Sequence, residues 1–119
     1  MKQRAPFHKE RFQEDLKSKL NIFLRREIHD PKLQFVSITK VECSKDLAYA
    51  DVFWDTFQLD QKEAIEHDLQ KLQRKMRAYL ANRLNVRHTP ALSLKFDGQF
   101  ESEMYMTQLL EKTRTSSPQ

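Results

Sequence analysis

The chain has 119 residues, of which 39% are hydrophobic and 32% charged, so it is long enough for one apolar core and too short for a second domain. A single Cys excludes an intramolecular disulfide, and no apolar run approaches the roughly 20 residues that a membrane-spanning helix needs. The net charge is +4, and the single glycine, Gly98, excludes phosphate-binding loops, dinucleotide-binding turns and nucleophile elbows, which all need glycine.

The first predicted element is a helix from about Phe7 to Ile28. Its apolar residues recur at helical spacing: Phe12, Leu16, Leu20, Phe23, Leu24 and Ile28. Pro6 before the helix and Asp30-Pro31 after it fit the rules for helix ends. One face of this helix is therefore expected to be buried, and Arg11 projects away from that face.

Two strands are predicted next, at residues 35–38 and 47–57, joined by the short polar connection 43–46. In the first strand the apolar residue Ile38 stands at an even position and Val41 at an odd one, so in a regular strand they would lie on opposite faces. One extra residue in a strand reverses the facing of the residues after it, so we expect a β-bulge near Thr39-Lys40.

The second strand separates its residues onto two faces. One face carries Ala48, Ala50, Val52 and Trp54, and the other carries Leu47, Tyr49, Asp51, Phe53 and Asp55. We expect the second, aromatic-acidic face to meet water or a protein partner. Stacking of bases on its aromatics is less favoured, because Asp51 and Asp55 would repel phosphate. Without a second acidic cluster, we interpret these two carboxylates as solvated strand residues rather than a metal site.

From Asp60 the pattern is helical again, with Ile65, Leu69, Leu72 and Met76 on one stripe. Leu80 and Leu84 continue that stripe but drift around the helix axis by roughly 40° for each four-residue step. A bend or break within residues 72–82 would correct the drift, and one continuous helix is the alternative. A strand at 92–96, a turn at Asp97-Gly98 and a short helix at 101–111 follow, and residues 112–119 are expected to be a disordered tail.

The charges are strongly segregated along the chain. Residues 1–26 carry +5, residues 42–68 carry −6, and residues 71–88 carry six Lys or Arg and no acid. Basic segments of this density favour a polyanion partner, although Lys and Arg can also simply solvate the outer faces of helices. The candidate phosphate contacts are Lys71, Arg74, Lys75, Arg77 and Arg87, with Lys45 and Arg11 extending them. Arg83 is discounted because the face on which it lies is ambiguous.

The predicted fold class is therefore α+β, with the order α-β-β-α-α-β and helices packed on one face of a three-stranded sheet. This arrangement is typical of a type II KH-like domain, here spanning residues 1–111, a fold much used for single-stranded RNA. The usual KH clamp is a Gly-x-x-Gly loop between the middle helices. No glycine is present there, so binding through that clamp is excluded.

Several stretches resemble ribosome-binding factor A, a family of small-subunit assembly factors. The matching stretches, from Arg11 to Leu110, are Arg26–Pro31, Val41–Val52, Met76-Arg77, Leu84, Arg87, Thr89-Pro90 and Leu92–Asp97. The resemblance implies a non-enzymatic protein that binds the small ribosomal subunit near its decoding region and assists late maturation of its rRNA. It also implies a role in growth at low temperature and release by an assembly GTPase.

One departure from the family pattern affects the middle helix. Members of the family have an Ala-x-Gly kink, and this chain has Leu72-Gln73-Arg74 at that place. Because the glycine is absent, we expect any kink here to be milder, or to be formed by tertiary packing rather than by local flexibility, and a continuous helix is the alternative.

The remaining chemistry-bearing residues do not form a catalytic or metal pattern. Cys43 is a lone thiol expected to be partly buried, and the histidines are scattered: His8, His29, His67 and His88. We therefore predict no enzyme activity, no cofactor and no metal, and a monomer that binds no membrane. The alternative is a protein-binding adaptor that uses the aromatic-acidic face. The lack of a secretion signal or an Arg/Ser-rich leader favours the bacterial cytoplasm over an organelle matrix.

Overall fold

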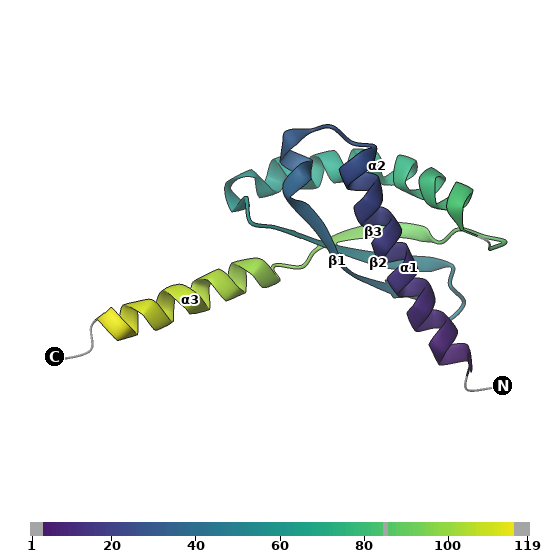
Figure 1. The fold of residues 1–119 in the computed structure, drawn as a ribbon. Helices are drawn as coiled ribbons and strands as arrows, with labels where there is room; N and C mark the ends of the chain where they lie inside the picture. The colour runs from purple at the N-terminus through teal and green to yellow at the C-terminus, as the bar shows by residue number, and fades with distance from the viewer. Residues whose placement is uncertain (1–3, 85, 116–119) are drawn as a thin grey trace.

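The computed structural model describes residues 4–84 and 86–115 as three helices and a three-stranded sheet (Figure 1). The helices and strands are α1 (Arg4–Arg26), β1 (Val36–Cys43), β2 (Tyr49–Thr56), α2 (Lys62–Arg83), β3 (Ala91–Phe96) and α3 (Gln99–Thr115). Short 3-10 helices, η1 at Pro31–Phe35 and η2 at Leu59–Gln61, precede β1 and α2. The α+β class predicted from the sequence is confirmed.

The sheet has the order β1-β2-β3, with β1 antiparallel and β3 parallel to β2. α2 supplies the crossover that a parallel pair requires. Figure 1 shows α1 and α2 over the same side of the sheet, while α3 projects away from it. The apolar faces expected for α1, β2 and α2 all enter one core, whose fully buried residues include Leu16, Leu20, Leu24, Val52, Trp54, Ile65, Leu69, Met76 and Leu80.

The predicted β-bulge in β1 is confirmed. The pairing with β2 shifts between Ile38 and Lys40. Asn21 of α1 holds this irregular backbone, because its amide side chain donates to the Ile38 carbonyl at 3.1 Å and accepts from the Ile38 N–H at 2.8 Å. The Thr39 hydroxyl also donates to the Asp97 carboxylate at 2.6 Å. Side chains from two distant segments therefore satisfy the polar groups that the bulge exposes.

The prediction of two middle helices is wrong. α2 is one unbroken helix from Lys62 to Arg83, so the described order is α-β-β-α-β-α. Residues 72–82 contain no glycine or proline to interrupt the helical hydrogen bonds. Met76 and Leu80 are both fully buried along this continuous path, and the Gln73 side chain donates to the Leu92 carbonyl of β3. The alternative of a continuous helix is the one that the structure adopts.

β2 begins two residues later than predicted. Leu47 has a positive φ of 61° and closes a turn in which its N–H donates to the Ser44 carbonyl. Non-glycine residues seldom adopt this conformation, so the sequence pattern of alternating residues did not reveal the turn. The Leu47 side chain still packs against the edge of the core.

The interpretation of Asp55 as a solvated residue is also wrong. Its side chain is fully buried, and its two carboxylate oxygens accept from the Thr56 and Phe100 N–H groups, each at 2.8 Å. Asp55 therefore ties β2 to the first turn of α3. That helix begins earlier than expected and continues through residues 112–115, which we expected in the tail, while 116–119 lie outside the described residues.

Candidate nucleic-acid interface

The candidate interface is an open groove between the C-terminal half of α2 and the loop that leads to β3. Its volume is about 510 Å³, and its lining is Arg74, Arg77, Ala78, Ala81, Arg87, His88 and Thr89. The loop turns back over α2 because Leu84 takes an extended conformation directly after the helix. We name this feature the basic groove.

Helical spacing places the α2 residues of the basic groove together. Arg74, Arg77, Ala78 and Ala81 are three or four positions apart and face away from the buried stripe that ends at Leu80. The two alanines leave room between the longer side chains. Lys71 and Lys75 are exposed on the adjoining flank of the same helix. Five of the predicted residues thus lie on or beside one surface: Lys71, Arg74, Lys75, Arg77 and Arg87.

Arg77 also fixes the shape of the groove. Its Nη2 and Nε donate to the Thr89 carbonyl at 2.9 Å and 3.3 Å, so one guanidinium ties the loop to α2. Arg87 and His88 lie within this tethered loop and are exposed. The sequence predicted Arg77 as a phosphate contact, but gave no sign of its bond to Thr89, because residues 12 apart in sequence meet only through the fold.

The cations of this surface are not neutralised by the protein. Within the described residues, no carboxylate forms an ion pair with any of the five named above. The ion-paired lysines lie elsewhere on the molecule: Lys17, Lys19, Lys32, Lys40 and Lys95. Positive potential therefore concentrates at the basic groove, which suits a partner with several negative charges.

The two outlying predicted residues lie differently. Lys45 is exposed in the β1–β2 hairpin, and that hairpin adjoins the groove loop because the Ala91 N–H donates to the Ala48 carbonyl at 2.9 Å. Arg11 is exposed on α1 and does not line the groove. Its neighbours Lys9 and Gln13 face Cys43 across a separate depression, and Arg11 points away from them.

Arg83 has a structural position rather than a place in the groove. Its guanidinium lies 3.7 Å from the centre of the Tyr79 ring and donates to the Tyr79 carbonyl at 3.4 Å. A cation near the last turn of a helix is also favoured by the helix dipole. Arg83, which is not among the predicted contacts, is also absent from the groove lining.

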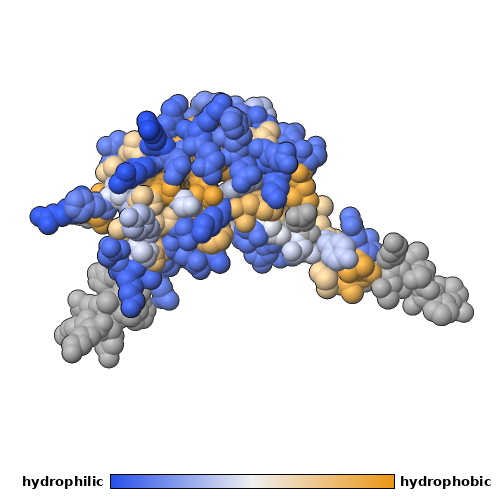
Figure 2. Space-filling view, turned by 180° about the vertical axis from the view of Figure 1, so that it is seen from behind, coloured by the Kyte–Doolittle hydropathy of each residue, from blue (hydrophilic) through white to orange (hydrophobic). Residues whose placement is uncertain are grey.

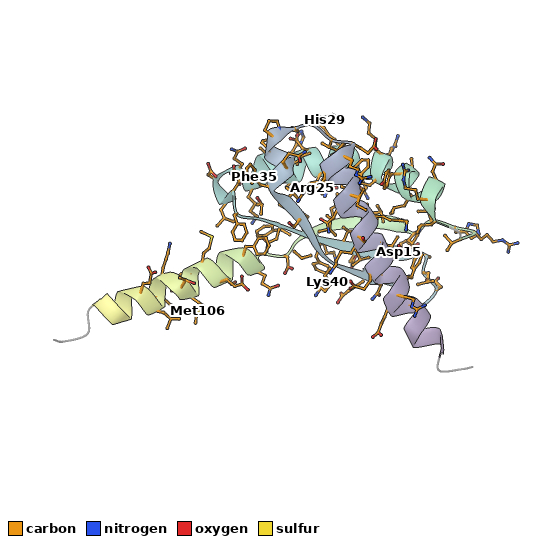
Figure 3. The ribbon with its side chains drawn as sticks, viewed as in Figure 1. Asp15, Arg25, His29, Phe35, Lys40 and Met106 are labelled. Atoms are coloured by element: carbon orange, nitrogen blue, oxygen red, sulfur yellow. The ribbon has the colours of Figure 1, made fainter. Side chains whose placement is uncertain are left out.

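The face of the sheet opposite α1 and α2, which we call the open face, is less acidic than predicted. Lys95 pairs with Asp51 at 3.3 Å, and Lys40, labelled in Figure 3, lies 4.6 Å from the centre of the Phe53 ring. The prediction of an aromatic-acidic face overlooked these two lysines, which the neighbouring strands bring into register with β2. With Asp55 buried, the face carries mixed charge.

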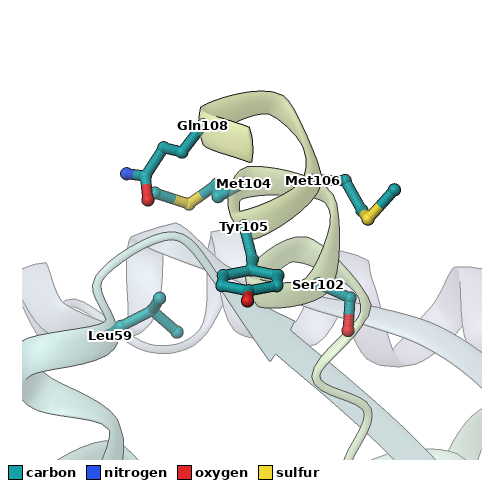
Figure 4. A pocket seen from close by; sticks show the side chains of 6 residues that line it. All are labelled: Leu59, Ser102, Met104, Tyr105, Met106 and Gln108. Carbon is teal, nitrogen blue, oxygen red and sulfur yellow. The ribbon is translucent and has the colours of Figure 1, made fainter. Parts of the chain in front are cut away.

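A further depression, of about 580 Å³, lies between Leu59 of η2 and the side chains of α3, among them Met104 and Tyr105 (Figure 4). Its lining contains no charged residue. Apolar surface is visible on the projecting arm in the view from behind (Figure 2), in keeping with the exposed Met106 and Leu110.

Burial raises the pKa of the Cys43 thiol, which makes it a poor nucleophile at neutral pH. Among the described residues, no three His, Cys, Asp or Glu side chains converge as metal ligands would, and no helix is both long and apolar enough to cross a bilayer. The side chain of His8 lies outside this description.

Together, the fold and the groove define a class of protein: a small α+β domain, consistent with the KH-like fold, that presents un-neutralised cations on one helix and its following loop. The sequence comparison makes the assignment specific. The chain belongs to the ribosome-binding factor A family, whose model matches residues 8–110.

Named relatives support this assignment over most of the chain. Ribosome-binding factor A of Natranaerobius thermophilus is 36% identical over 107 residues, which cover 87% of this chain and 80% of the relative. The factor of Clostridium perfringens strain SM101 is 33% identical over 114 residues, covering 92% and 97%.

Solved structures agree with the fold. The crystal structure of ribosome-binding factor A from Thermus thermophilus has a TM-score of 0.67 and 26% identity, covering 74% of this chain and 93% of the other. A homology model of the Thermus thermophilus factor, fitted into a cryo-EM map of its complex with the 30S subunit, has a TM-score of 0.62 and 26% identity, covering 71% and 90%.

Proposed function

We propose that this protein binds the small ribosomal subunit and its rRNA through the basic groove and assists late maturation of the subunit without catalysing a reaction. The observation that carries the proposal is the set of exposed cations on α2 and its following loop that no described carboxylate neutralises. Membership of the ribosome-binding factor A family supports rRNA as the polyanion rather than another negatively charged partner.

The groove binds phosphates by charge and position. Arg74 and Arg87 on its two walls can each take a phosphate through two N–H donors, whereas Lys71 and Lys75 act as point charges. Such contacts release counterions and carry no sequence information, so affinity depends strongly on salt and specificity comes from the shape of the assembling subunit. Arg77 contributes mainly by holding the loop in place.

The family resemblance extends this proposal. It supports a role in growth at low temperature and release by an assembly GTPase, within the bacterial cytoplasm and with the protein acting as a monomer. A strain lacking the protein is then expected to accumulate immature small subunits, most strongly in the cold.

A pelleting experiment tests the binding surface. Purified protein is sedimented with small subunits, large subunits and free RNA at graded salt. The double charge reversal Arg74→Glu with Arg87→Glu removes two groove cations, and Lys17→Glu with Lys19→Glu changes the net charge equally on α1, outside the groove lining. We expect salt-sensitive pelleting with small subunits alone. The groove variant is expected to lower the log–log salt slope by about 0.7–0.9 per lost contact, and the control variant to change it less.

Two results would contradict the proposal. Equal losses in both variants would mean that only net charge matters, and unchanged binding in the groove variant would place the interface elsewhere. The adaptor alternative predicts pelleting with neither subunit and a tight protein partner on the open face of the sheet. The structure favours it less, because Lys40 and Lys95 balance the acids of that face.

A further inference from the structure

One aromatic side chain remains open at the end of the sheet that adjoins the basic groove. Tyr49, the first residue of β2, is 66% exposed, and its hydroxyl forms no hydrogen bond with a described residue. The other aromatic residue on this face, Phe53, is covered by Lys40 at 4.6 Å. Tyr49 is thus the aromatic ring that this face presents most openly.

The strand register explains why the ring is open. The residue paired with Tyr49 on β3 is Ala91, and on the other side the Ser44 N–H donates to the Tyr49 carbonyl. Both neighbours are small, so neither can cover the ring. The next acids on this face, Asp51 and its β1 partner Glu42, are paired with Lys95 at 3.3 Å and with Lys40 at 3.5 Å, which reduces the repulsion that a nearby phosphate would meet.

The same register places Tyr49 close to the groove cations. Arg87 is four residues before Ala91, and Lys45 is four residues before Tyr49. A chain of four residues spans at most about 14 Å, so both cations have their backbone within that distance of the sheet end that carries Tyr49. Tyr49 lies on the face of the sheet opposite α2, so a bound RNA strand reaches it by passing around the loop, with phosphates on Arg87 or Lys45 and a neighbouring base on the ring.

We infer that Tyr49 is a stacking platform for an unpaired base of the RNA bound at the basic groove. The inference rests on the proposed function and extends it from phosphates to bases. Stacking on an aromatic ring is tolerant of sequence, so Tyr49 selects single-stranded over paired RNA without selecting a particular base. The protein would then hold a segment of rRNA that has not yet paired.

The test uses two labelled probes of equal length, about 12 nucleotides, one an oligoadenylate and the other an abasic oligonucleotide with the same number of phosphates. The variants are Tyr49→Leu, which keeps the apolar bulk without the ring, and Tyr49→Phe, which keeps the ring. Tyr105→Leu is the matched control, because Tyr105 is 60% exposed and lies on α3, which projects away from the sheet. Thermal unfolding of each variant verifies that it is folded.

We expect Tyr49→Leu to weaken oligoadenylate binding about fivefold or more, and to leave both abasic binding and the salt slope unchanged. Tyr49→Phe and Tyr105→Leu should bind as the parent protein does. Parent-like oligoadenylate binding by Tyr49→Leu, equal losses on both probes, or no binding by the parent protein would each overturn the inference. The proposed function is judged separately, by the pelleting of small subunits with the groove and control charge reversals.

Discussion

Gly98 allows a direct test of the junction between β3 and α3. Its φ is +75°, a left-handed conformation that costs a residue with a Cβ about 1–2 kcal/mol. A Cβ built at this position would lie 3.2 Å from Cε2 of Phe96, closer than ordinary van der Waals contact. The substitution Gly98→Ala therefore combines a strained backbone with a close contact, at the place where the chain turns from strand into helix.

The backbone cost of Gly98→Ala is partly offset in the unfolded state. Ala has less conformational freedom than Gly in the unfolded chain, which offsets about 0.4–1 kcal/mol of the lost stability. The Phe96 ring can move aside, since it is only half-buried, so its contact adds little. We therefore expect a local loss of about 1 kcal/mol, which corresponds to about fivefold weaker protection of the amides that anchor α3.

The assay is amide hydrogen exchange at two positions. The Phe100 N–H donates to Asp55 at 2.8 Å, and the Ser102 N–H donates to the Gly98 carbonyl at 3.1 Å. Gly98→Asn introduces the same Cβ but tolerates the left-handed conformation better, so it should fall between Gly and Ala. Unchanged exchange in Gly98→Ala, or equal effects of Asn and Ala, would refute the reasoning from backbone conformation.

Three further predictions concern the body of the domain. Asp55→Ala leaves the buried Thr56 N–H and the half-buried Phe100 N–H without their acceptor and should lower the free energy of unfolding by about 1–3 kcal/mol, measured by urea denaturation. Leu80→Ala opens a cavity at a fully buried site and should cost about 2–5 kcal/mol in the same assay, whereas a cost near zero would contradict its place in the core. Burial raises the pKa of Cys43 above its ordinary 9.0, so less thiolate is present at any pH below that; iodoacetamide should therefore modify the folded protein more slowly than the urea-unfolded one, and equal rates would contradict the burial.

The sequence predicted well those elements in which the spacing of apolar residues matches the spacing of the residues that the structure buries. The β-bulge could be located because one extra residue moves Val41 to the opposite parity from Ile38, and both are buried in the structure. The inward face of β2 was predicted for the same reason. Five cations near the groove could be named because they fall within one segment that lacks acids.

The features that the sequence could not predict depend on contacts between distant segments. The alternation of β2 places Asp55 on the same face as Asp51. Asp55 is nevertheless buried, because the first turn of α3 brings the Phe100 N–H to its carboxylate. The bond from Arg77 to Thr89, and therefore the shape of the basic groove, has the same origin. The predicted break in α2 was wrong for another reason. An apolar stripe that drifts slowly around a straight helix can stay buried along its whole length, as Ile65, Leu69, Met76 and Leu80 do, so the drift requires no break.

The separation of free from paired cations has a consequence for how the protein meets its partner. The 71–88 segment carries six positive charges, more than the net charge of +4, so the rest of the chain is negative as a whole. The field of a polyanion exerts a torque on such a dipole and turns the α2 face toward it before any contact forms. Added salt should then slow association more than it speeds dissociation, because orientation acts at long range and is screened first.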